Sequence, residues 1–213
     1  LAAIHALLGL ARSDLAGSLK PSVDRLLKVD FDQLDKTGKL ALLRTYSVIM
    51  SRGGAPDTNQ VLAIGEQLDP FFPSSDDNLN EELCRVLCFL EHPTVVRKTI
   101  ALMKTTQAKI PDYDAEVMKR HKGYGARILS TMEADAAPNI LNIHLLFCLK
   151  DVRSGWSMND RKAYLGELQN LATKKGGNMF TGYIQKIRES AIASVPEKDR
   201  ISLQYLMGCL LYT

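Results

Sequence analysis

The stretch "NLNEELCRVLCFLEHPTVVRKTIALM", residues 78 to 103, decides the fold class. Apolar residues recur there at the 3.6-residue spacing of an α-helix, once before Pro93 and again after it. Because only a few residues separate the two stripes, we expect two antiparallel helices joined by a short turn. The first stripe contains Leu79, Leu83, Val86, Leu87 and Leu90, and the second contains Val95, Val96, Ile100 and Met103.

Patterns of the same kind fill most of the chain on both sides of this hairpin, and no comparable segment alternates with period two. The segment 140–149 is apolar nearly all round, which predicts a central helix that is buried on all sides. The helix-turn-helix unit recurs about every 35 to 45 residues, which is typical of HEAT-type repeats. We therefore expect an all-α fold, an α-solenoid (α-α superhelix) of irregular HEAT-like hairpins, with a single helical bundle as the alternative.

The expected domain organisation is one helical-repeat domain over residues 1–213. The chain opens "LAAIHALLGLAR" without Met, so we expect it to be a piece of a longer polypeptide. The stretch "DPFFPSSDD", residues 69 to 77, combines two prolines with several turn-forming residues and predicts an internal boundary near residues 70–78.

Charge and composition narrow the function classes. The chain carries 27 Lys and Arg against 24 Asp and Glu, which is far from the strongly basic balance expected of a nucleic-acid binder. Its basic residues concentrate at Lys119, Arg120 and Lys122 and at Lys174 and Lys175. A HEAT-like nucleic-acid-binding protein or DNA-repair enzyme using these residues is one alternative function. No apolar run approaches the roughly 20 residues of a membrane-spanning helix, so we expect no membrane span.

A metal or redox module is the second alternative function. Cys84 and Cys88 stand four residues apart on one side of a helix, and His92 continues the line. Because cysteines on an apolar stripe are usually small buried hydrophobic residues, we expect no metal site and no cofactor here.

Trp156 is the only tryptophan and lies in "SGWSMNDRKAYLGELQN", residues 154 to 170. Gly155 is expected to end the preceding helix, and Ser157 with Asp160 resembles a capping box that starts the next one, whose apolar stripe begins at Tyr164. We expect Trp156 to pack one helical hairpin against the next, with an aromatic platform for a peptide or sugar as the rival interpretation.

His144 lies in the middle of the apolar segment 140–149. We expect it to be a core histidine bonded to a neighbouring helix or loop rather than a catalytic base.

Four stretches carry a resemblance to a known group of proteins: "KLALLRTYSVIMSRGG", "LDPFFPSSDDNLNEELCRVLCFLEHPTVVRKTIALM", "IHLLFCLKDVRSGWSMNDRKAYLGELQN" and "GGNMFTGYIQKIRESA". They resemble a helical region of large multidomain proteins of Planctomycetes and related bacteria. In those proteins HEAT-like repeats accompany a dehydrogenase-type β-propeller and a c-type cytochrome module. The resemblance implies a periplasmic or cell-envelope location. We expect no haem on this segment, since Cys88 is followed by Phe89 and the Cys-x-x-Cys-His signature is absent.

The sequence contains no Gly-x-Gly-x-x-Gly, Walker A, Gly-x-Ser-x-Gly or His-Glu-x-x-His motif. We therefore expect a non-catalytic scaffold for protein docking or spacing within a larger exported protein that carries redox modules elsewhere. Its expected partner is another protein or another domain of the same chain.

Overall fold

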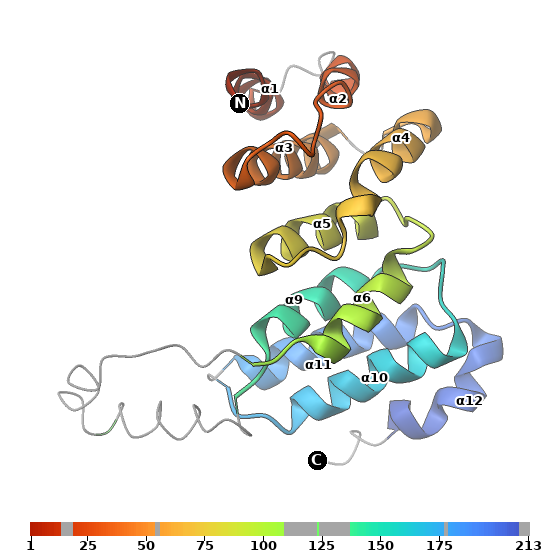
Figure 1. The fold of residues 1–213 in the computed structure, drawn as a ribbon. Helices are drawn as coiled ribbons and strands as arrows, with labels where there is room; N and C mark the ends of the chain where they lie inside the picture. The colour runs from red at the N-terminus through yellow and green to blue at the C-terminus, as the bar shows by residue number, and fades with distance from the viewer. Residues whose placement is uncertain (14–18, 54–55, 109–122, 124–136, 177–178, 209–213) are drawn as a thin grey trace. The chain divides into compact units, whose positions relative to one another are not determined.

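A computed structural model describes residues 1–13, 19–53, 56–108, 123, 137–176 and 179–208 (Figure 1). These residues form α-helices and one short 3-10 helix, and they contain no β-strand. The prediction of an all-α fold is therefore confirmed for the described part of the chain.

The chain divides into two compact units, Leu1–Thr99 and Ile100–Thr213. The first unit holds α1 (Ala2–Arg12), α2 (Leu19–Leu26), α3 (Lys36–Gly53), α4 (Thr58–Leu68), the 3-10 helix η1 (Asp69–Phe71), α5 (Asp77–Phe89) and the start of α6 (Val95–Thr105). The second unit holds the rest of α6, α9 (Ile140–Leu149), α10 (Met158–Ala172), α11 (Phe180–Ala193) and α12 (Glu197–Gly208).

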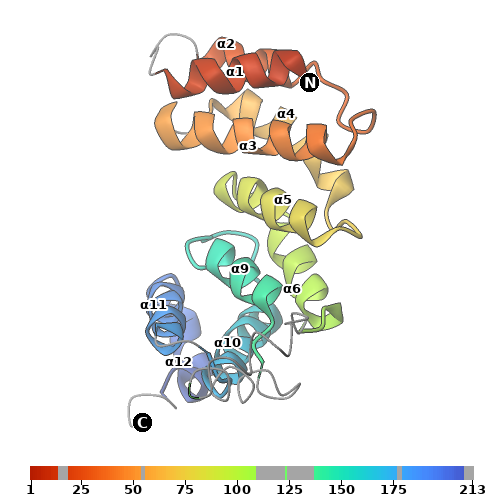
Figure 2. The ribbon, with the colours of Figure 1, turned by 90° about the vertical axis from the view of Figure 1, so that its left-hand side faces the viewer.

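Helices pack on one another two positions apart along the chain in both units. In the first unit α1 packs on α3, and α3 packs on α5, while α2 lies beside α1 and α3 (Figures 1 and 2). In the second unit α9 contacts α11 and α10 contacts α12, and α10 also packs on α11. Each unit therefore contains contacts between helices two positions apart as well as between successive helices.

Short polar side chains fix where several helices begin. Asp57, Asp76 and Asn139 each accept a hydrogen bond from the backbone N–H three residues later, which satisfies one of the free donors of the first turn. At the start of α10, the side chains of Ser157 and Asp160 form both hydrogen bonds of the capping box that the sequence predicts.

The two helices predicted from residues 78 to 103 are present as α5 and α6. Their apolar stripes are buried, with Leu83, Leu87, Val95 and Val96 fully inaccessible to solvent. The turn between the two helices contains Glu91, whose φ of 49° lies in the left-handed region.

The proline-rich loop near residues 70–78 lies inside the first unit, whereas the two units divide between Thr99 and Ile100, within α6. The Asn80 side-chain amide ties this loop to α5. Its Oδ1 accepts from the Ser74 N–H at 2.7 Å, and its Nδ2 donates to the Ser74 carbonyl at 2.8 Å.

The segment 140–149 forms α9, but the prediction that this helix is buried on all sides was wrong. Ile140 is 65% exposed and Phe147 is 42% exposed, so one face of α9 meets solvent. The opposite face is buried through Leu141, Leu145 and Leu149. Hydrophobic residues on all sides of a helix allow full burial, but the neighbouring helices decide which faces are covered.

Candidate functional site

Trp156 joins the end of one hairpin helix to the start of the next. Its indole N–H donates to the Val152 carbonyl at 2.8 Å, in the turn that follows α9. Its ring meets the ring of Tyr164 on α10 edge to face, with centroids 5.2 Å apart and planes at 70°. The side chain is only partly buried.

Gly155 and Tyr164 hold this arrangement in place. Gly155 has a φ of 74°, a conformation that glycine adopts without strain. The prediction that Gly155 ends the preceding helix was wrong, because α9 ends at Leu149. The Tyr164 hydroxyl donates to the Leu146 carbonyl at 2.8 Å, which links α10 to α9.

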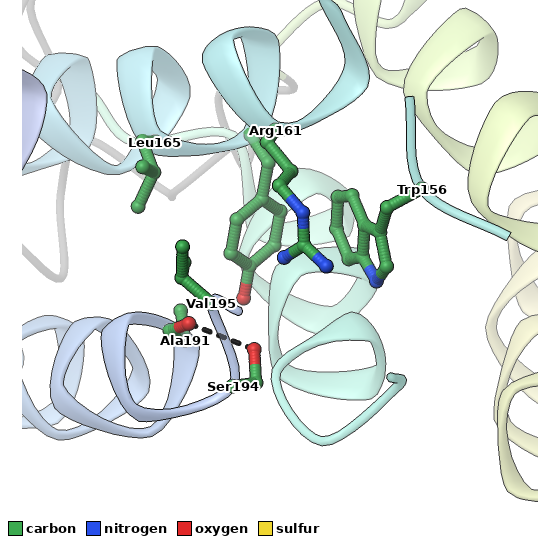
Figure 3. A pocket seen from close by; sticks show the side chains of 7 residues that line it. Trp156, Arg161, Leu165, Ala191, Ser194 and Val195 are labelled. Carbon is green, nitrogen blue, oxygen red and sulfur yellow. Dashed lines mark hydrogen bonds between the residues drawn. The ribbon is translucent and has the colours of Figure 1, made fainter. Parts of the chain in front are cut away.

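Arg161 lies beside the Trp156 ring and extends toward Ser194 at the end of α11 (Figure 3). Only 5% of the residue is exposed, and its guanidinium carbon lies 5.1 Å from the centre of the Trp156 ring, within the range of a cation-π contact. Its acidic neighbour is Asp199, whose Oδ2 lies 3.7 Å from Nε, too far for a hydrogen bond. Burial lowers the pKa of Arg161, and the negative charge of Asp199 offsets this only in part.

The side chains around Arg161 line a small pocket between α10 and the C-terminal end of α11. Its space is about 200 Å³ even when the part open to solvent is included, which is below the range of about 300–1,000 Å³ typical of small-molecule sites. The pocket therefore accepts no more than the tip of a side chain or a small ion. The lining residues are Trp156, Arg161, Tyr164, Leu165, Ala191, Ser194 and Val195 (Figure 3).

The chemistry of the pocket is that of a cation beside the aromatic ring of Trp156. Ser194 directs its hydroxyl to the Ala191 carbonyl at 2.8 Å, and none of the pocket-lining residues is a His, Asp, Glu or Cys that would act as a general base or a thiol nucleophile. A buried guanidinium is suited to binding an anionic group.

The structure brings Cys84 and Cys88 together but gives His92 other partners. The two sulfur atoms are 3.7 Å apart and buried in α5, and Cys84 also contacts the Thr99 hydroxyl at 3.7 Å. His92 Nδ1 instead lies 3.1 Å from the hydroxyl of Thr94. Within the part of the chain that the structure describes, no three His, Cys, Asp or Glu side chains are placed to hold a metal ion.

His92 belongs to a polar cluster that links η1 to the start of α6. Asp69 accepts hydrogen bonds from the Thr94 hydroxyl and, at 2.8 Å, pairs with Lys98, while His92 Nδ1 lies 3.4 Å from the same carboxylate. Burial alone would raise the pKa of Asp69, but the hydrogen bonds from Lys98 and Thr94 outweigh it and hold that pKa below its usual value. This cluster serves as a structural connection within the first unit.

His144 is not the core histidine that the sequence predicts. It is half-buried on α9, and its Nε2 lies 3.3 Å from the sulfur of Cys148 on the same helix. The reason is that position 144 falls on the face of α9 that also carries the exposed Ile140 and Phe147.

The predicted basic concentrations are only partly described. Lys119, Arg120 and Lys122 lie outside the described residues, and Lys174 and Lys175 follow the end of α10. Across the described ranges, no helix has both the length and the apolar character needed to cross a membrane.

The sequence analysis did not identify the buried polar residues of the second unit, among them Arg161 and Asn142. Arg161 lies on the apolar stripe of α10 with Tyr164, Leu165 and Leu168, so a charged residue at an apolar position was the signal that could have identified it. Asn142 left no such signal, because its partners come from two other segments of the unit, the end of α6 and α10. Its amide accepts from Thr106 Oγ1 at 2.7 Å and donates to Glu167 Oε1 at 2.9 Å and to the Met103 carbonyl at 3.3 Å.

No protein-family model matches the chain, and no match was found among curated proteins or among solved structures.

Proposed function

We propose that the chain is a non-catalytic scaffold of HEAT-like helical hairpins that docks a protein partner or another domain of its parent protein. The observation that carries the proposal is the packing of helices two positions apart. The contacts of α1 with α3, of α3 with α5, of α9 with α11 and of α10 with α12 are those that stacked hairpins make.

The positions of these helices along the chain support the same proposal. In the first unit the helices that stack on one another begin at Ala2, Lys36 and Asp77, and in the second unit they begin at Ile140 and Phe180. These starts are 34 and 41 residues apart in the first unit and 40 residues apart in the second. Such spacings fall among the repeat lengths of helical-hairpin solenoids, about 34 residues for tetratricopeptide repeats and about 40–47 for HEAT-type repeats.

A docking role follows from the physical properties of such stacks. Each hairpin needs only its neighbours to bury its apolar face, so the remaining surface is free to vary and to bind a partner. We further propose, from the family resemblance, that the parent protein is exported and works in the periplasm or cell envelope.

The proposal is tested by retaining proteins from an envelope extract of the source organism on the immobilised chain. Two charge reversals on exposed residues, Arg44→Glu on α3 and Lys186→Glu on α11, alter one surface of each unit without touching a buried contact. A docking scaffold retains a defined protein, identified by mass spectrometry, and loses it with the reversal that lies on the docking surface. If the wild-type chain retains no protein above the level of bare resin, the docking role is wrong and the chain is a spacer.

A further inference from the structure

We propose that the pocket around Arg161 and Trp156 binds the carboxylate of an acidic side chain, Asp or Glu, from the protein partner. This inference rests on the proposed docking function and specifies the chemistry of the partner at one point of contact.

The first step is the shortage of partners for a buried cation. The Arg161 side chain is 6% exposed, and a guanidinium carries five N–H donors. Among the described residues its side chain makes no hydrogen bond, and its acidic neighbour, Asp199, stays 3.7 Å from Nε. Buried charges in proteins are normally paired and hydrogen-bonded, since removing them from water is costly. A ligand that supplies acceptors to this side chain would compensate that cost.

The second step is that the other polar side chains of the pocket already donate hydrogen bonds within the protein. Trp156, Tyr164 and Ser194 each donate to a backbone carbonyl, at 2.8 Å in all three cases. The guanidinium therefore remains as the donor group that the pocket offers to an incoming molecule. A ligand held by this group must be an acceptor, and an anionic one makes the stronger bond.

The third step is the shape of the site. Figure 3 shows the guanidinium extending from α10 beside the ring of Trp156 toward the end of α11 that carries Ser194. The Trp156 ring on one side of the cation favours a flat ligand that binds in the plane of the guanidinium, as a carboxylate does when it accepts two parallel N–H bonds. The small volume of the pocket suits the tip of an acidic side chain and excludes larger ligands.

Asp199 sets the expected strength of binding. Its carboxylate lies on the Nε side of Arg161 and is 23% exposed, so it neutralises part of the charge without covering the guanidinium. A single carboxylate is then expected to bind with a dissociation constant on the order of 1 to 10 mM, and affinity for a whole partner would come from additional contacts.

The experiment uses the fact that Trp156 is the only tryptophan, so the fluorescence of the intact chain reports on this pocket. The probe is N-acetyl-glutamate amide, a blocked glutamate, and the matched neutral probe is N-acetyl-glutamine amide. Both are titrated to about 100 mM at constant ionic strength. We expect a saturable change in emission with the glutamate probe and a response at least about tenfold weaker with the glutamine probe. No saturable change with glutamate, or equal responses to the two probes, overturns the inference without reference to any variant.

Variants and other anions locate the binding and identify its chemistry. Arg161→Gln should abolish saturation, whereas Lys186→Gln, which removes the same charge from an exposed position of α11, should leave it unchanged. Circular dichroism verifies that each variant is folded. Saturation by inorganic phosphate or by N-acetylglycine, a mimic of a chain terminus, in preference to the blocked glutamate would also overturn the assignment.

The outcomes separate this inference from the proposed function. If the chain retains a partner in the extract and Arg161→Gln retains it equally, the scaffold stands and the carboxylate pocket is wrong. If no partner is retained but blocked glutamate saturates the Trp156 signal in the wild type only, the pocket stands and the docking role is wrong.

Discussion

Replacement of Trp156 by Ala tests whether this residue holds two helices together. The substitution removes the edge-to-face contact with Tyr164, the contact with the Arg161 cation and the hydrogen bond to the Val152 carbonyl. In other proteins an aromatic pair contributes about 0.5–1.5 kcal/mol and a cation-π contact about 0.5–2 kcal/mol. A hydrogen bond contributes about 1 kcal/mol. Because such contributions are not additive and the ring is only partly buried, we expect a total loss of about 2 to 3 kcal/mol.

This value is below the roughly 3–5 kcal/mol of a fully buried aromatic residue. For a chain of this length it corresponds to a fall in melting temperature of about 5 to 10 °C. Thermal unfolding followed by far-ultraviolet circular dichroism measures it, since the variant has lost the fluorescent indole. Trp156→Phe keeps a ring but not the N–H donor and should lose about half as much.

The matched control is Tyr205→Ala on α12, an aromatic residue of the same unit that is 63% exposed. We expect this control to change stability by less than about 0.5 kcal/mol. A Trp156→Ala variant as stable as the control would show that the indole does not join the hairpins, and the rival role as a surface platform would then be favoured.

Three further predictions concern other contacts. Gly65→Ala should destabilise the first unit by about 1 to 3 kcal/mol in urea unfolding, because a Cβ there would lie 2.6 Å from the His92 ring, and His92→Ala in the same chain should restore part of the loss. In the folded chain the pKa of Asp69 is lowered, so its carboxylate stabilises the fold above about pH 4 and this contribution disappears as the pH falls further. The urea midpoints of wild type and Asp69→Asn should therefore converge in acid. A difference between the two midpoints that grows below about pH 4 would contradict a stabilising role for the Asp69 carboxylate. Cys148 is half-buried and lies 3.3 Å from His144, so it should react with iodoacetamide faster than the two buried cysteines of α5. His144→Gln should slow the reaction of Cys148, and peptide mapping by mass spectrometry measures both rates.

The start of α10 could be predicted because its cap depends on neighbours in the sequence, whereas the predicted stop of α9 at Gly155 was wrong. The capping box of Ser157 and Asp160 involves two side chains three residues apart, and it forms as expected. The apolar stripes of α5 and α6 were likewise predicted, since each buried side chain follows the period of its own helix. The proposed hairpin period comes from the same local pattern.

The burial of α9 and the setting of Arg161 could not be predicted in this way. An all-apolar helix does not indicate which of its faces will be covered by other helices. His144 is partly exposed because it lies on the face of α9 that meets solvent. Arg161 is buried because Trp156 and the end of α11 close over it, and α11 begins 19 residues later in the chain at Phe180.

By itself, the sequence determined the fold class, the helical segments and the caps that begin them, because hydrogen bonds and side-chain periodicity within a helix are local interactions. Only the tertiary structure decided which helices stack on which, which face of α9 meets solvent and which charged side chain lies in a pocket. These properties depend on the packing of residues far apart in the chain, where a small difference in how helices meet determines whether a side chain is buried or exposed.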